Sequence, residues 1–152
     1  MKDIQESEVF KQAHALVLAV YRLTERFPNR EMFGLSSQLR RAALSVTSNL
    51  VEGSQRMSQA EYRHFVSLSK GSAAEARYQM RVAFDLGYLA EKDFLQMSGS
   101  YERVIRMLRG LYTSLDGHRQ TRNQEPGTRN SRAFTLLEVI IAIVLVAVLT
   151  AI

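Results

Sequence analysis

Apolar residues recur at intervals of three and four in four separate stretches of this chain, a spacing that places them on one face of a helix. These stretches predict helices over residues 7–27, 35–55, 58–87 and 91–115. Pro28 ends the first helix and Gly87 ends the third. Four amphipathic helices joined by short turns favour an all-α fold, an antiparallel up-down-up-down four-helix bundle.

Local signals add detail to these helices. Ser58 and Glu61 have the spacing of a capping box at the start of the third helix. Tyr21 belongs to the inward stripe of the first helix. Asn49 lies close to the inward face of the second helix and needs a hydrogen-bond partner there, because a buried unpaired amide is costly. Gly53 lies near the same face and lets another helix approach closely.

The residues that would carry chemistry are absent or scattered. The chain has no cysteine, and it contains no phosphate-binding glycine loop, no HExxH and no nucleophile elbow. His14, His64 and His118 are far apart in the sequence, and a lone histidine does not make a metal site. We therefore expect no catalytic residues, no metal and no cofactor, and the chain is predicted not to be an enzyme.

A line of cations is the main candidate binding feature. The net charge is +5, and Arg63, Lys70 and Arg77 follow one another at seven residues, which is nearly two helical turns and places them on one side of the third helix. The candidate nucleic-acid-binding residues are Arg40, Arg41, Arg56, Arg63, Lys70, Arg77 and Arg81. Such a surface would track phosphates and weaken steeply with salt. The alternative is a solvated face whose cations pair with Asp and Glu.

The last part of the chain differs from the rest. Residues 117–132 lack apolar periodicity and carry four arginines, which predicts a basic flexible linker after a bundle of residues 1–116. Residues 134–152 hold a single charge, Glu138, and as a helix would span about 28 Å, nearly a bilayer core. This predicts a transmembrane helix, with the bundle cytoplasmic and anchored to the inner membrane.

Several segments of the bundle carry a family resemblance over residues 6–116. The pieces "QLRRAALSV", "SNLVEGSQR", "GSAAEARYQ" and "LGYL" resemble the four-helix bundle proteins encoded in intervening sequences of 23S rRNA genes. The fold class is similar to that of the accessory variability determinant of diversity-generating retroelements. The resemblance implies a homo-oligomeric ring, a pentamer, and no catalytic residues. It also makes Gly71 a close-contact point and Asn49 and Gln79 internal hydrogen-bonding groups.

For the accessory determinant, the resemblance further implies a basic surface that binds nucleic acid, and a reverse transcriptase as partner. We expect RNA rather than DNA. The leading hypothesis is therefore a non-enzymatic oligomeric scaffold that binds nucleic acid, acting as an accessory to a reverse transcriptase.

The C-terminal segment carries a second resemblance. "FTLLEVIIAIVLVAVLTAI" resembles the N-terminal helix of type IV prepilins and pseudopilins, with Phe134 at the first mature position and Glu138 at the fifth. This implies a prepilin peptidase that cuts after Ala133, although glycine usually precedes that cut. The chain stops before a pilin head, so a genuine fusion and a truncated or mis-joined reading frame both remain open. The alternative function is a membrane-tethered protein-interaction module linked to type IV pilus or secretion assembly.

Overall fold

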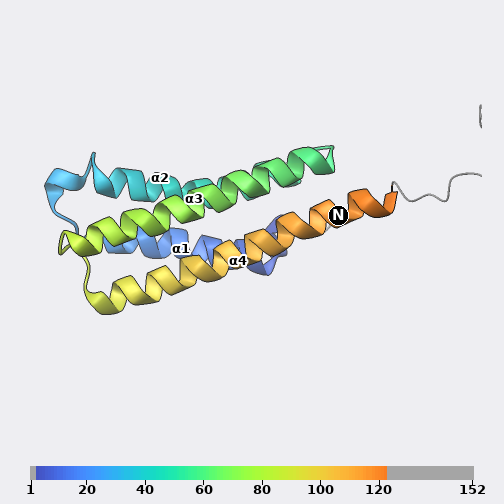
Figure 1. Ribbon diagram of the computed structural model, residues 1–152. Coiled ribbons are helices and arrows are strands. Elements are labelled where there is room, and N and C mark those ends of the chain that lie inside the picture. Colours follow the sequence, from blue (N-terminus) through green and yellow to red (C-terminus); the bar gives the residue numbers. More distant parts are fainter. Residues whose placement is uncertain (1–2, 123–152) are drawn as a thin grey trace, which may run out of the picture. The chain divides into compact units, whose positions relative to one another are not determined.

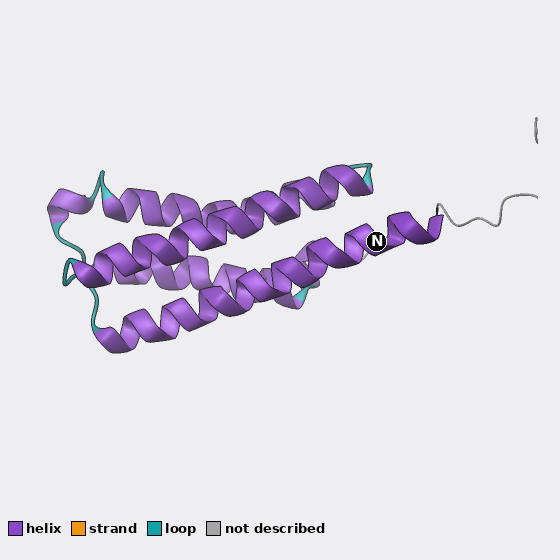
Figure 2. Ribbon diagram, viewed as in Figure 1, coloured by secondary structure: helices purple, strands orange, loops and turns teal. Residues whose placement is uncertain are grey.

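The computed structural model describes residues 3–122, and this part of the chain is helical, without β-strands. Four α-helices run side by side as a bundle (Figures 1 and 2). They are α1 (Glu8–Thr24), α2 (Leu35–Ser54), α3 (Gln59–Asp85) and α4 (Glu91–Arg122), with short 3-10 helices η1 (Ile4–Glu6) and η2 (Asn29–Glu31). The predicted all-α fold with four helices is confirmed.

The starts of α1 and α3 are fixed by serine caps. The Ser7 hydroxyl accepts from the Phe10 N–H at 3.3 Å, and the Ser58 hydroxyl accepts from the Glu61 N–H at 3.1 Å. The predicted capping box is only half formed. In a complete capping box the Glu61 carboxylate would accept from the Ser58 backbone N–H. Here this carboxylate accepts from the Ser58 hydroxyl instead, at 2.8 Å.

Gly87 ends α3 as predicted, and it does so through a left-handed turn. Its φ is 77°, a conformation that residues with a Cβ rarely adopt. The Gly87 N–H donates to the Phe84 carbonyl and the Tyr88 N–H to the Ala83 carbonyl, both at 2.9 Å. These two bonds form a Schellman motif and satisfy carbonyls that the helix end would leave unpaired.

The inward faces of the four helices form one apolar core. Its largest fully buried side chains include Tyr101, Leu39, Leu50, Met80, Leu108 and Val66. Tyr21 was predicted to face inward, but the structure corrects this, since its side chain is 40% exposed. The buried face of α1 is centred on Leu16, Val20 and Leu23, which leaves Tyr21 at the margin.

The contact between α2 and α3 is very close at Gly53. A Cβ atom added there would lie 2.6 Å from the Phe65 Cβ and 3.0 Å from the Tyr62 Cδ2, so only glycine fits without a shift. The prediction that Gly53 permits a close approach is therefore confirmed. The same role expected of Gly71 is wrong, because an added Cβ at this exposed position meets nothing within 4 Å among the described residues.

Polar side chains form hydrogen bonds within α2 and between α2 and α3. Within α2, the Asn49 side-chain amide donates to the Ser45 carbonyl at 2.8 Å, which gives Asn49 the partner that its position requires. The hydroxyls of Ser45 and Ser72 lie 2.9 Å apart across the two helices. The buried Ser69 hydroxyl donates to the Val46 carbonyl at 2.8 Å.

Two turns are tied together at one end of the bundle. The Tyr88 hydroxyl, from the turn between α3 and α4, donates to the Glu31 carboxylate at 3.1 Å. The other oxygen of Glu31 accepts from the Leu35 N–H at 3.0 Å, which caps the start of α2. Arg30 donates to the Tyr88 hydroxyl at 3.3 Å. Figure 1 shows these two turns at the same end, opposite the turn between α2 and α3.

The fourth helix is longer than predicted. It continues to Arg122, so residues 117–122 are helical rather than the start of the linker. Once a helix is nucleated, each added residue gains a hydrogen bond, and Arg and Gln are good helix formers. The loss of apolar periodicity near residue 115 therefore does not mark the end of the helix.

No helix among residues 3–122 is long and apolar enough to cross a membrane. The rest of the predicted linker, residues 123–132, and the apolar segment of residues 133–152 lie outside the described residues. The predicted transmembrane helix belongs to that segment.

Candidate nucleic-acid interface

The cations of α3 lie along its contact with α4. Arg63, Lys70 and Arg77 are partly buried there, and Arg81 is exposed at the end of the same line. Arg63 pairs with Asp116 of α4, and the Arg77 Nε donates to the Ser98 hydroxyl of α4 at 3.2 Å. The structure thus places these four residues along the line where α3 meets α4, which we call the α3–α4 groove.

Aromatic rings lie beneath these cations. The Arg63 guanidinium lies 4.7 Å and the Lys70 ammonium 5.8 Å from the centre of the Tyr112 ring. Arg81 lies 5.7 Å from the centre of the Phe94 ring, which itself stacks on Phe84 at 4.7 Å. A cation over a ring is attracted to its negative face, so the rings hold the cations in place.

Sequence reasoning missed this role of Tyr112 and Phe94. Both belong to the inward stripe of α4, and that stripe alone indicates core packing. Their partly buried positions at the edge of the core are visible only once α3 and α4 are placed together.

Three of the cations already have carboxylate partners. Arg56 pairs with Glu52, Arg63 with Asp116, and Arg81 with Asp85 at 2.9 Å. For these three the paired, solvated face is the better description, and exposed pairs of this kind contribute little to stability.

Lys70 and Arg77, at the middle of the line, have no carboxylate partner within 4.0 Å among the described residues. Lys70 lies over the Tyr112 ring and Arg77 donates to the Ser98 hydroxyl, so a neutral group and not a carboxylate contacts each cation. The centre of the groove is therefore its most positive part.

Arg40 belongs to a different contact. Its Nε donates to the Thr24 hydroxyl of α1 at 2.7 Å, and its guanidinium lies 5.0 Å from the centre of the Tyr21 ring. Arg40 thus links α2 to α1 and is not part of the α3–α4 groove. Arg41 is its exposed neighbour on α2.

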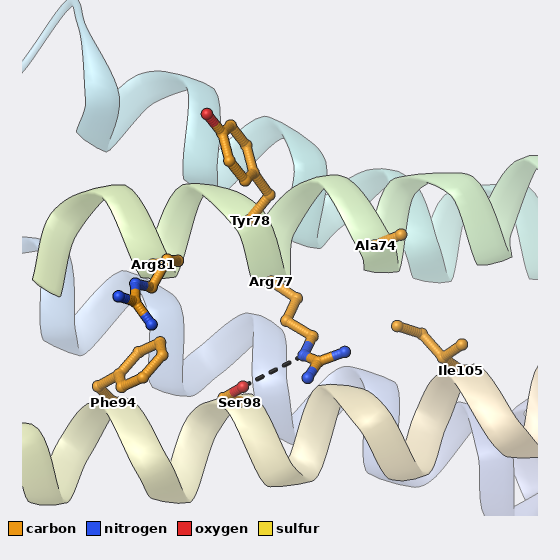
Figure 3. A pocket seen from close by; sticks show the side chains of 7 residues that line it. All are labelled: Ala74, Arg77, Tyr78, Arg81, Phe94, Ser98 and Ile105. Atoms are coloured by element: carbon orange, nitrogen blue, oxygen red, sulfur yellow. Dashed lines mark hydrogen bonds between the residues drawn. The ribbon is translucent and has the colours of Figure 1, made fainter. Parts of the chain in front are cut away.

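A cavity of about 330 Å³ opens between α3 and α4 beside Arg77 (Figure 3). It is lined by Ala74, Arg77, Tyr78, Arg81, Phe94, Ser98 and Ile105. Figure 3 shows the Arg77 side chain reaching from α3 toward α4, between Ser98 and Ile105, while Tyr78 points away from α4. The cavity therefore combines a guanidinium group with an apolar wall.

Titratable groups elsewhere in the bundle suggest packing rather than chemistry. Burial raises the pKa of the Tyr101 and Tyr62 hydroxyls, which keeps both phenols neutral. No cluster of three or more His, Cys, Asp or Glu residues that could hold a metal ion occurs within residues 3–122. Ala133, Phe134 and Glu138, the predicted prepilin-like processing residues, lie outside that range.

Comparison with known proteins gives two family matches. Residues 5–110 match the model of the family described as 23S rRNA-intervening sequence protein. Residues 128–152 match the model described as prokaryotic N-terminal methylation motif. None of the curated proteins compared with the chain matches it.

One similar solved structure is a protein of unknown function from the S23 ribosomal protein family of Bacteroides thetaiotaomicron. The two chains are 16% identical and superpose with a TM-score of 0.62, over 68% of this chain and 97% of that chain. At this level of identity the likeness shows a shared fold.

Proposed function

Because the chain belongs to the 23S rRNA-intervening sequence protein family, we propose that it is a non-enzymatic helical protein that binds RNA along the α3–α4 groove. The observation that carries this proposal is the pair of unneutralised cations at the centre of the groove, Lys70 and Arg77. The family's link to 23S rRNA favours RNA over DNA as the ligand.

The way these two side chains are held supports phosphate binding. The Lys70 ammonium lies over the Tyr112 ring and the Arg77 Nε donates a hydrogen bond to Ser98, so both side chains are partly ordered before a ligand binds. A preordered side chain loses less conformational entropy on binding. A row of cations on one side of a helix contacts the phosphate backbone of RNA and does not read its base sequence. We therefore expect broad sequence specificity and an affinity that depends strongly on salt.

The proposal takes the bundle in up-down-up-down order. Contacts that pair residues in reverse order support this arrangement, with Ser45 near Ser72 and Gly53 near Phe65 between α2 and α3. The resemblance to the accessory variability determinant leads us to propose also a homo-oligomer, a pentameric ring, with a reverse transcriptase as partner. Native mass spectrometry of the full chain would give the number of subunits directly.

The binding test uses the full 152-residue chain, kept in solution with a non-ionic detergent because of its apolar C-terminal segment. Fluorescence anisotropy would follow titration of structured RNA, single-stranded RNA and duplex DNA at two salt concentrations. The informative variant reverses the two central charges, Lys70→Glu with Arg77→Glu. The matched control reverses two exposed charges outside the groove, Arg22→Glu with Lys92→Glu, and therefore changes the net charge equally.

We expect the groove variant to lose RNA binding while the control retains it. Equal affinities for wild type and groove variant would contradict the assignment of this surface. Equal losses in both variants would show that net charge, rather than the groove, drives binding.

The match of residues 128–152 to the methylation motif supports a second proposal. In it, the C-terminal segment tethers a cytoplasmic bundle to the inner membrane as a protein-interaction module linked to type IV pilus or secretion assembly. A full-length chain that floats with membranes would support the tether, and one that stays in the soluble fraction would refute it. Incubation with a prepilin peptidase, followed by intact-mass measurement, would show whether the bond between Ala133 and Phe134 is cut.

A further inference from the structure

The cavity beside Arg77 offers more than a positive charge, because one side of it is apolar. We infer that this cavity takes an unpaired nucleobase, preferably guanine, from the RNA whose phosphates follow the α3–α4 groove. The inference rests on the proposed function and gives Arg77 a narrower role within it. The fork of Arg77 contacts the base edge, while Lys70 contacts a phosphate about 10 Å away along α3.

The apolar wall matches the flat face of a base. Ala74 of α3 and Phe94 and Ile105 of α4 line the cavity, and Phe94 and Ile105 are only partly buried in the bundle. A phosphate or a free inorganic anion would not need such a wall. The volume of about 330 Å³ falls within the range of small-ligand sites.

The donors of Arg77 match the edge of guanine. Its Nε donates to the Ser98 hydroxyl, whereas its two terminal amino groups make no hydrogen bond or ion pair with the protein among the described residues. These groups can only donate hydrogen bonds. Guanine presents two adjacent acceptors, O6 and N7, and a guanidinium fork binds such a pair well. Adenine presents a donor beside its N7, so it fits this fork less well.

The cavity would select single-stranded RNA. In a duplex, each base is stacked on both faces and paired at one edge, so it cannot enter a cavity between two helices of a protein. Unpaired bases can turn outward, stack on aromatic or guanidinium groups and hydrogen-bond through their edges. The presence of Phe94 and two arginines in the lining agrees with that mode of recognition.

The test compares short RNAs that differ at one position. Full-length protein in non-ionic detergent is titrated with an oligouridine that carries a central guanosine, adenosine or uridine, and with a hairpin in which the guanine is paired. We expect the unpaired guanosine to bind about tenfold more tightly than uridine, as one well-formed bidentate contact allows. The paired guanine should show no such advantage.

Three variants locate the effect. Ala74→Leu fills the cavity without changing the charge, and Arg77→Lys keeps the charge but removes the fork. Both should bind the guanosine-containing RNA no more tightly than oligouridine. Ala60→Leu is the matched control, since Ala60 is an exposed alanine of the same helix outside the cavity, and it should retain the preference.

The outcomes separate the two ideas. If oligouridine binds but guanosine brings no advantage, or if Ala74→Leu retains the preference, the cavity site is wrong and the phosphate-binding groove stands. If wild-type protein binds none of the RNAs at low salt, the proposed function fails and the base site fails with it. Circular dichroism of each variant checks that the helical content is unchanged.

Discussion

The replacement of Gly53 by alanine tests the close contact between α2 and α3. The new Cβ would lie 2.6 Å from the Phe65 Cβ, whereas carbon atoms in good contact are about 3.5–4.0 Å apart. Phe65 Cβ is bonded to the backbone of α3 and cannot turn aside as the end of a flexible side chain could. Relief of the overlap therefore requires α2 and α3 to separate by about 1 Å at this point.

Two opposing effects set the magnitude for Gly53→Ala. Overpacking of a tight contact typically costs about 1–3 kcal/mol. Alanine is favoured over glycine in a helix by about 1 kcal/mol, which offsets part of that cost. Because the contact involves helix backbone, we expect the larger overpacking cost to win, with a net loss of about 1–2 kcal/mol in the free energy of unfolding.

Gly71→Ala provides the matched control in α3. Its Cβ would meet nothing within 4 Å, so only the helix preference should act, and the protein should gain about 0.5–1 kcal/mol. Urea denaturation followed by circular dichroism at 222 nm, a wavelength that reports helix in general, would measure both variants against wild type. A Gly53→Ala protein as stable as wild type would refute the close-packing argument. A comparable loss in Gly71→Ala would mean that Gly71 packs against something outside the described chain.

Three further changes address local features. Ser58→Ala should cost about 1 kcal/mol of unfolding free energy, because the Glu61 N–H loses its acceptor; an unchanged urea midpoint would contradict the cap. Gly87→Ala should cost about 1–2 kcal/mol through its φ of 77°, whereas Gly99→Ala in α4 should not; equal thermal midpoints for the two variants would count against the Schellman motif. Tyr101→Phe should leave stability unchanged or raise it by up to about 1 kcal/mol near neutral pH, because the buried hydroxyl has no partner among the described residues. Burial raises the Tyr101 pKa above its usual 10.0, so the wild-type protein loses stability as the pH rises past 10.0. Above that pH the stability advantage of the variant should grow by about 1.4 kcal/mol per pH unit. Urea titrations at neutral and alkaline pH that give a constant difference between the two proteins would refute this.

Features set within a few residues of the chain could be predicted from the sequence. The cap at Ser58 and the end of α3 at Gly87 depend on bonds to residues only a few positions away. The apolar stripes gave the number of helices for the same reason, since each stripe is a property of one helix. Gly53 was identified because it lies beside such a stripe.

The division of the cations into paired and unpaired groups could not be predicted in this way. Arg63 meets Asp116, which lies 53 positions further along the chain. Lys70 meets the Tyr112 ring on the same helix as Asp116. A stripe indicates which face of a helix is inward, but it does not set the rotation and the axial offset between two packed helices. Those two quantities decide which cation finds a carboxylate.

The tie between Glu31 and Tyr88 makes the two ends of the bundle unequal. It joins the α1–α2 turn to the α3–α4 turn, and the bond from Arg30 to Tyr88 does the same, so the helices are held at that end by hydrogen bonds between turns. The α2–α3 turn lies at the opposite end, and its Met57 is fully exposed. Transient opening should therefore begin at the α2–α3 turn, and it is there that a protease would first cut and an inserted tag would disturb the bundle least.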